Sequence, residues 1–220
     1  MSLERRANLA RSIIAIAGAS ASGKTLFSQT VYQELKTELG GEPLAMLAED
    51  AYYRDQSHMA FDEREKTNYD HPNAFEHELL LSHLKALKAG EDVHVPTYDF
   101  SRHTRACDTQ LVKTANFILV EGILLLSDPK LRKLFDIKVF VDTPLDICLL
   151  RRIERDTQER GRSFESIAEQ YQATVRPMYY EYIEPCKQHA HIVVTGGGKN
   201  RVAIDMVKEH IKSSLRQITI

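Results

Sequence analysis

The chain has 220 residues, which suits one domain with a buried core, or one domain with a substantial insertion. Hydrophobic residues make up 43% of it and charged residues 27%, so the composition excludes a disordered or collagen-like chain. The 29 Lys and Arg residues against 31 Asp and Glu residues leave a net charge of −2, which argues against a nucleic-acid-binding protein with a basic surface.

The cysteines point to a reducing compartment. Cys107, Cys148 and Cys186 are odd in number, far apart and without metal-ligand spacing, so we predict free thiols. The apolar runs are shorter than the ~20 residues that a membrane-spanning helix needs. These features predict a cytoplasmic protein with no membrane partner.

The first part of the chain alternates apolar and amphipathic segments. A buried strand is predicted over 12–17, followed by a helix over 23–39 that Gly40 and Gly41 end. A second short strand is predicted over 44–48.

The middle of the chain is more varied. The segment 49–72 is polar and aromatic, has no sustained period and is too long for a simple connection. A helix is predicted over 73–89, and the alternation over 93–113 predicts a hairpin or small antiparallel sheet. Two more buried strands are predicted over 117–120 and 137–141.

The last part of the chain is mainly helical. An Arg-rich helix is predicted over 145–161, and a helix over 164–190 with a kink or break at Pro177. A strand over 192–195 and a closing helix over 201–215 complete the pattern.

Five apolar strands that alternate with helices predict an α/β fold in a single domain, 1–220. Strands of this kind form a parallel sheet that helices cover on both faces. The segment 93–113 would then be a small antiparallel insertion.

A phosphate-binding motif lies between the first strand and the first helix. It matches G-x-x-x-x-G-K-[ST] and comprises Gly18, Ala19, Ser20, Ala21, Ser22, Gly23, Lys24 and Thr25. Small residues let backbone N–H groups wrap a triphosphate, and the helix adds the positive end of its dipole. This context predicts a P-loop NTPase-type fold; the alternative is a small-residue turn with a chance lysine.

Two acidic residues follow predicted strands. Glu121 follows the strand 117–120, and Asp50 follows the strand 44–48. Because ligands bind beyond the carboxyl ends of parallel strands, we predict that both residues and the Thr25 hydroxyl hold Mg²⁺. The alternative for Glu121 is a carboxylate that faces solvent.

Several segments together resemble the uridine kinase (uridine-cytidine kinase) family, within the phosphoribulokinase and uridine kinase group of P-loop kinases. The resemblance covers nearly the whole chain and rests on GASASGKT, EDAYY, NYDHPNAF, PTYDFSRHTR, VEGIL, VDTPLDICLLRRIERDTQERGR and EQYQATVRPMY. It implies transfer of the γ-phosphoryl group of ATP or GTP to the 5′-hydroxyl of uridine, and also of cytidine, in pyrimidine salvage. It also implies Mg²⁺ and a homotetramer.

The resemblance implies roles for single residues. Asp50 would be the general base, with Lys24 on the phosphates, while Asp70 would bind the ribose 2′ and 3′ hydroxyls or, on the sequence alone, form a turn before Pro72. The base would be bound by Tyr53, Tyr98, Phe100 and His103. The adenine of the donor is expected near Lys199, where some relatives carry an acidic residue.

The arginines over 151–176 are predicted to form a lid. By resemblance Arg155 and Arg160 would contact phosphate, Arg152 and Arg162 would contact nucleoside or phosphate, and Gln170 would contact the nucleoside. Arg151 is predicted to be merely exposed. The alternative for the whole run is a solvated helix face whose arginines pair with Glu154, Asp156 and Glu159.

Two other functions fit a phosphate loop. One is a kinase for another small alcohol, as in phosphoribulokinase or pantothenate kinase, although Asp70, Tyr98 and His103 suit a ribonucleoside. The other is a nucleotide-hydrolysing regulator, but the N-K-x-D motif that reads guanine in GTPase switches is missing from the sequence. For a kinase the predicted partners are a small-molecule nucleoside and a nucleoside triphosphate, with no nucleic acid and no membrane; a regulator would instead hydrolyse nucleotide to change its partners.

Overall fold

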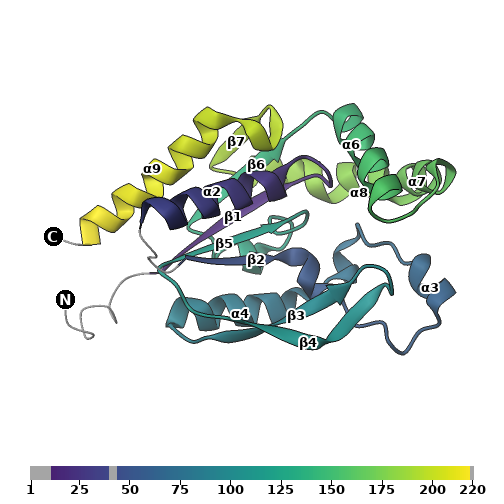
Figure 1. Ribbon diagram of the computed structural model, residues 1–220, viewed down its shortest axis with the longest axis horizontal. Helices are drawn as coiled ribbons and strands as arrows, with labels where there is room; N and C mark the ends of the chain where they lie inside the picture. The colour runs from purple at the N-terminus through teal and green to yellow at the C-terminus, as the bar shows by residue number, and fades with distance from the viewer. Residues whose placement is uncertain (1–10, 40–43, 219–220) are drawn as a thin grey trace.

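A five-stranded parallel sheet forms the centre of the structure, a computed structural model that describes residues 11–39 and 44–218 (Figure 1). Its strands are β1 (Ser12–Gly18), β2 (Leu44–Ala48), β5 (Phe117–Gly122), β6 (Ile137–Asp142) and β7 (Ile192–Thr195). They lie in the order β2-β5-β1-β6-β7, and every pair in the sheet is parallel. The predicted α/β fold with about five parallel strands is therefore confirmed.

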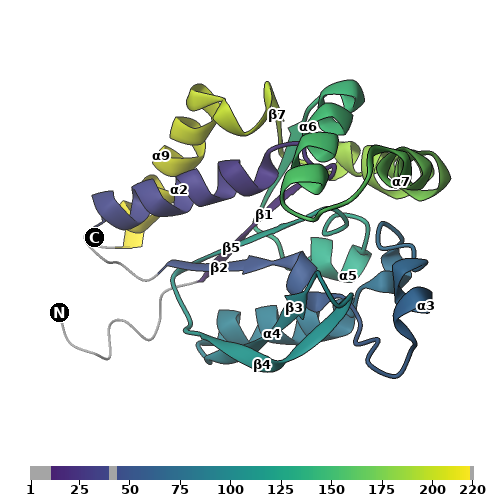
Figure 2. The same ribbon diagram turned by 45° about the vertical axis from the view of Figure 1, so that its right-hand side comes forward.

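Helices cover both faces of the sheet because side chains alternate along each strand. Ile14 and Ile16 of β1 belong to the core cluster that includes α2 (Lys24–Glu38) and α9 (Arg201–Ile218). Ile13 and Ala15 belong to the opposite cluster, which includes α4 (His77–Ala89). Figures 1 and 2 show α2 and α9 together on one side of the sheet and α4 on the other.

The predicted insertion is a two-stranded antiparallel sheet. It consists of β3 (Val93–Asp99) and β4 (Thr104–Val112), with an irregularity in the pairing between Pro96 and Tyr98. Pro96 cannot donate a hydrogen bond, which suits it to such a position. This hairpin contacts the 3₁₀ turn that follows β2, so it stands over the carboxyl end of that strand.

The segment before α4 departs from the prediction of one helix over 73–89. Pro72–Ala74 is a separate 3₁₀ turn, and α4 begins only at His77. Between them Phe75 is extended and forms an isolated antiparallel bridge with Tyr53. The bridge prevents helical geometry there. The segment before it contains the 3₁₀ turn Glu49–Tyr52 and the short helix α3 (Phe61–Glu65).

The Arg-rich helix α6 (Leu145–Gln158) ends three residues before its predicted end, and α7 (Phe164–Gln170) follows. The helical conformation is not interrupted at Pro177, where a kink or break was predicted. Instead the short helix α8 (Arg176–Met178) lies between two π-helical turns, Tyr171–Val175 and Tyr179–Ile183. Wider turns accommodate a residue that lacks an N–H group. A 3₁₀ stretch, Glu184–His189, leads to β7.

The remaining elements are short. They are α5 (Pro129–Arg132) and the 3₁₀ turn Gly197–Lys199 before α9. The predicted helix end at Gly40 and Gly41 lies outside the described residues. Over 11–39 and 44–218, no helix has both the length and the apolar character to cross a bilayer.

Candidate active site

One cavity of about 1580 Å³ opens at the carboxyl ends of β1, β2 and β5. Such a position is where ligands bind in open α/β sheets. Seventeen of the twenty-one site residues predicted from the sequence line it: Gln170 and Ser20, Ala21, Gly23, Lys24, Thr25, Asp50, Tyr53, Asp70, Tyr98, Phe100, His103, Glu121, Arg152, Arg155, Arg160, Arg162. The fold thus brings the predicted phosphate, sugar, base and lid residues to a single space.

The phosphate loop is held open by close backbone packing. Gly23 has a left-handed φ of 93°, and a Cβ atom there would lie 2.7 Å from the backbone nitrogen of Gly198. The Thr143 hydroxyl donates to the carbonyl oxygen of Ser22 at 2.8 Å. These contacts fix the loop at the N-terminus of α2, where N–H groups and the helix dipole favour an anion.

Four predicted nucleotide-binding residues do not line the cavity. Gly18, Ala19 and Ser22 are buried parts of the loop, and Lys199 is exposed in the turn that packs against Gly23. The first three shape the backbone of the loop rather than its surface. The role of Lys199 toward the donor base stays a prediction.

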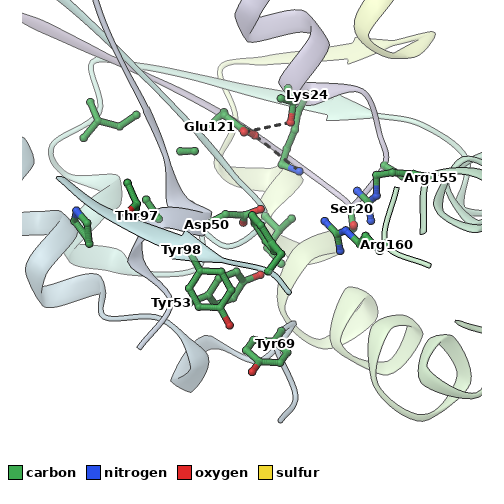
Figure 3. Close-up of a pocket in the computed structure, with 18 of the residues that line it drawn as sticks. Ser20, Lys24, Asp50, Tyr53, Tyr69, Thr97, Tyr98, Glu121, Arg155 and Arg160 are labelled. Carbon is green, nitrogen blue, oxygen red and sulfur yellow. Dashed lines mark hydrogen bonds and ion pairs between the residues drawn. The ribbon is translucent and has the colours of Figure 1, made fainter. Parts of the chain in front are cut away.

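Lys24, Thr25 and Glu121 form a polar group at the base of the loop, and Figure 3 shows Lys24 and Glu121 facing each other. The Thr25 hydroxyl donates to Oε1 of Glu121 at 3.2 Å, and Lys24 Nζ lies 3.9 Å from Oε2. That Oε2 is buried and accepts no hydrogen bond from any described residue. Mg²⁺ takes hydroxyl and carboxylate oxygens and completes its shell with phosphate and water, so these residues fit the predicted ion.

Asp50 lies in the 3₁₀ turn after β2, between the Lys24 and Glu121 group and the aromatic rings (Figure 3). Burial raises the pKa of its carboxyl to about 6; the charge of Lys24 opposes the shift, while Glu121 and Glu49 add to it. At neutral pH the group is still mainly ionised, and it is a stronger base than an exposed aspartate. A carboxylate with this pKa can accept a proton from a hydroxyl.

Asp70 is the second carboxylate of the cavity. It is buried, and its backbone N–H donates to the side chain of Asn68 at 3.2 Å, which makes a local turn. A turn is present before Pro72, but Asn68 supplies its side-chain acceptor, and Asp70 also lines the cavity. Burial raises the pKa of Asp70, and Arg152 and Lys24 oppose the shift.

Aromatic rings wall the part of the cavity nearest the hairpin. Tyr53 stacks on Phe75 with 4.2 Å between centroids, and its ring lies 5.0 Å from that of Tyr98. The Tyr98 hydroxyl is buried and has no hydrogen-bond partner within the described residues. Phe100 lies 5.2 Å from Tyr98 at the rim. The pocket therefore offers flat apolar walls and one unpaired hydroxyl.

His103 stands at the turn of the hairpin with a left-handed φ of 50°. Its ring stacks on Tyr69 at 5.5 Å, and the Tyr69 hydroxyl donates to Gln56 at 3.0 Å. Burial lowers the pKa of His103, so the imidazole is neutral at pH 7 and offers one donor and one acceptor. Tyr69 was not among the predicted site residues, although it lies in the polar, aromatic segment 49–72.

The lid arginines point toward the cavity rather than only to solvent. Gln170 Oε1 accepts from Arg152 at 2.9 Å and from Arg162 at 2.6 Å. Arg152 also reaches the hydroxyl of Ser20 in the phosphate loop at 3.3 Å. The guanidinium group of Arg160 lies over the Phe100 ring at 5.0 Å.

Two of the lid predictions need correction. Arg151 is exposed as predicted, but it also lines the cavity, and its Nη1 lies 3.4 Å from the carbonyl oxygen of Ser22. The other is Asp156, which the alternative of a solvated face treats as a surface partner. It is completely buried, whereas Glu154 and Glu159 are exposed. Helical spacing places Asp156 beside Arg152, but it does not reveal which side of α6 is covered.

A buried ion pair behind Asp50 was not predicted. Glu49 is fully buried, and its Oε1 lies 2.8 Å from Nε2 of His77 at the start of α4. Its other oxygen accepts from the backbone N–H of Leu124 at 2.9 Å. Glu49 therefore ties the turn that carries Asp50 to two other elements.

Comparisons with known proteins show which family the chain resembles over most of its length. The model of the Phosphoribulokinase / Uridine kinase family matches residues 13–203. Uridine kinase from Aliivibrio salmonicida is 56% identical over 204 residues, which are 93% of this chain and 95% of that protein. Uridine kinase from Shewanella amazonensis is 57% identical over 203 residues, 92% of this chain and 96% of that protein.

Solved structures with the same fold are more distant in sequence. A crystal structure of a proposed fructose transport system kinase from Silicibacter sp. has a TM-score of 0.68 at 22% identity, covering 87% of this chain and 94% of that chain. D-glycerate 3-kinase from Cryptococcus neoformans has a TM-score of 0.58 at 16% identity, covering 80% of each chain. These two structures support the fold alone.

Proposed function

Because the chain belongs to the phosphoribulokinase and uridine kinase family, we propose that it phosphorylates the 5′-hydroxyl of uridine, and also that of cytidine, with ATP or GTP as the donor. One observation carries the proposal. The phosphate loop and the aromatic pocket open into the same cavity, and Asp50 lies between them.

The donor would bind at the phosphate loop. Backbone N–H groups of the loop and the N-terminus of α2 would bind its phosphates, and Lys24 would neutralise the β and γ groups. Thr25 and Glu121 would hold Mg²⁺, with Asp50 close by. When bound, the ion would supply positive charge that offsets the negative charge of the phosphates. The unpaired oxygen of Glu121 supports this assignment.

The acceptor would bind on the other side of Asp50. The Asp70 carboxylate would accept hydrogen bonds from the two ribose hydroxyls, and the base would lie against Tyr53. The unpaired hydroxyl of Tyr98 and the neutral imidazole of His103 would bind the polar edge of the pyrimidine.

In the transfer step, Asp50 would accept the proton of the 5′-hydroxyl as that oxygen attacks the γ-phosphorus. The bond between the γ-phosphorus and the β–γ bridging oxygen breaks, and the nucleoside diphosphate leaves. Arg155 and Arg160 would offset the negative charge on the transferred group. Most of the catalysis would therefore come from positioning and charge.

The test is to incubate the protein with Mg-ATP and, separately, uridine, cytidine, 2′-deoxyuridine, pantothenate and ribulose 5-phosphate. We expect monophosphates from uridine and cytidine, and far less product from deoxyuridine because half of the Asp70 contact is lost. Phosphorylation of another alcohol would replace the proposed substrate. Hydrolysis of ATP at a rate that uridine does not change would instead support a regulator.

A further inference from the structure

One buried carboxylate organises the lid. The side chain of Asp156, in the last turn of α6, is 0% exposed, and four arginines surround it. Its two oxygens face different pairs. Oδ1 lies 2.8 Å from Arg155 and 3.7 Å from Arg160, whereas Oδ2 lies 3.6 Å from both Arg152 and Arg162.

The contacts of Asp156 Oδ2 with its two arginines are longer than hydrogen bonds. Asp156 Oδ2 and Arg152 Nε are both buried, face each other at 3.6 Å, and neither makes a hydrogen bond within residues 11–39 and 44–218. A charged N–H donor normally approaches a carboxylate to about 2.8 Å. A small movement of these two side chains toward each other would let Arg152 Nε donate a hydrogen bond to Asp156 Oδ2.

Competition between four arginines for one carboxylate explains why Arg152 and Asp156 do not come closer. A single carboxylate faces four guanidinium groups, and Arg155 already makes the short contact with it, including a hydrogen bond of 2.9 Å from Nε. Burial and the charges of the neighbouring arginines lower the pKa of Arg160 and of Arg162, so the crowding of cations around Asp156 disfavours their charged forms. Anions that bind Arg155 and Arg160 would relieve the competition for Asp156.

The two pairs also face different ligands in the proposed function, on which this inference rests. Arg155 and Arg160 would face the triphosphate. Arg152 and Arg162 converge on Gln170, whose side-chain oxygen accepts from both, and would face the nucleoside. Arg152 also reaches Ser20 of the phosphate loop, so this pair adjoins both ligands.

We propose that Asp156 is a positioning residue that couples triphosphate binding to nucleoside binding. When phosphate oxygens take over Arg155 and Arg160, the charge of Asp156 becomes available to Arg152 and Arg162. These two arginines then move closer to Asp156 Oδ2. Through their hydrogen bonds to Gln170 they fix the side chains that would bind the nucleoside. Linkage requires the reverse effect to be equal, so the nucleoside strengthens triphosphate binding by the same factor.

The experiment is calorimetric titration of uridine into the whole protein, with and without a saturating non-hydrolysable ATP analogue and Mg²⁺. In the unmodified protein we expect the analogue to tighten uridine binding about five-fold or more. In Asp156→Asn we expect that ratio to fall toward one, while uridine binding without the analogue changes little. Glu154→Gln removes the same charge from an exposed site on the same helix, and we expect it to keep the ratio.

Several outcomes would overturn the inference. Independent binding of the two ligands to the unmodified protein would do so without any variant. So would a retained ratio in Asp156→Asn, even with a lower melting temperature, because that is the result of a merely structural role. If neither ligand bound the unmodified protein, the proposed function would fail as well, whereas independent binding leaves that function intact.

Discussion

At the scale of single residues, burial decides the chemistry of the cavity. Asp50 has a pKa of about 6 mainly because the folded chain removes it from water, and His103 is held neutral by the same cause. Neither shift can be read from neighbours in the sequence. The charges of Lys24 and Glu121, which come from other elements, adjust the Asp50 value further.

Replacing Asp50 tests its role as a base. Asp50→Asn should lower kcat by about 10²- to 10⁴-fold, because general-base assistance is lost, and should leave uridine binding largely intact. In the unmodified enzyme the ionised carboxylate is the active form, so kcat/KM should rise with pH through about 6 and then level off. Steady-state kinetics over this range measure both effects. Unchanged turnover in the variant would contradict the assignment.

Replacing His103 tests recognition of the base. His103→Ala removes a neutral donor and acceptor and the ring stacked on Tyr69, so nucleoside kcat/KM should fall about ten-fold or more. The KM for ATP should change little because the phosphate loop is untouched. His94, on the exposed part of the hairpin, supplies the matched control His94→Ala. An equal rise of both KM values would count against a base-binding role.

At the scale of elements, one buried ion pair joins three parts of the fold. Glu49 follows β2, His77 begins α4, and the backbone of Leu124 follows β5. Burial disfavours the charged form of His77, but the hydrogen bond and charge of Glu49 outweigh it and raise the His77 pKa. The pair thus fixes the turn that carries Asp50.

Removing His77 leaves the carboxylate of Glu49 buried without its ionic partner. His77→Ala should lower the free energy of unfolding by about 3 kcal/mol, measured by urea denaturation. The stabilisation from a raised histidine pKa is full below the unfolded value of 6.5 and is lost as pH rises through the folded pKa. The difference between the two proteins should therefore be largest at low pH.

The matched control lies on the same helix. Nδ1 of His83 makes a 3.0 Å hydrogen bond with the uncharged hydroxyl of Tyr52, so His83→Ala should cost only about 1 kcal/mol. Equal losses in the two variants would mean that the charge of Glu49 contributes nothing beyond an ordinary hydrogen bond.

At the scale of the whole molecule, the sheet and its two helical layers bring distant segments to one cavity. The phosphate loop, the hairpin and the lid are separated by tens of residues along the chain, yet they line the same space. The described surface also keeps large apolar side chains exposed, such as Val202 at 70% and Met206 at 61% on α9. Exposed apolar groups of this size suit a contact between subunits.

We propose, from the family resemblance, that the protein is a homotetramer in the cytoplasm. Light scattering coupled to size-exclusion chromatography should give a mass four times that of the 25.1 kDa chain. If the α9 surface takes part, Met206→Glu should lower this mass, because a charge would be buried in the contact. Glu209→Gln, on the same helix, removes a charge instead and serves as its comparison. A mass of one chain in the unmodified protein would refute the assembly.

The sequence by itself determined the phosphate loop, the five strands, the hairpin and most of the residues around the cavity. Strand and helix periodicity reports burial directly, and the loop motif is contiguous, so both can be read from local order. Only the tertiary structure decided that Asp156 is buried among four arginines, that Glu49 pairs with His77, and that π-helical turns flank Pro177. These features depend on which segments meet in space, and no local pattern encodes that.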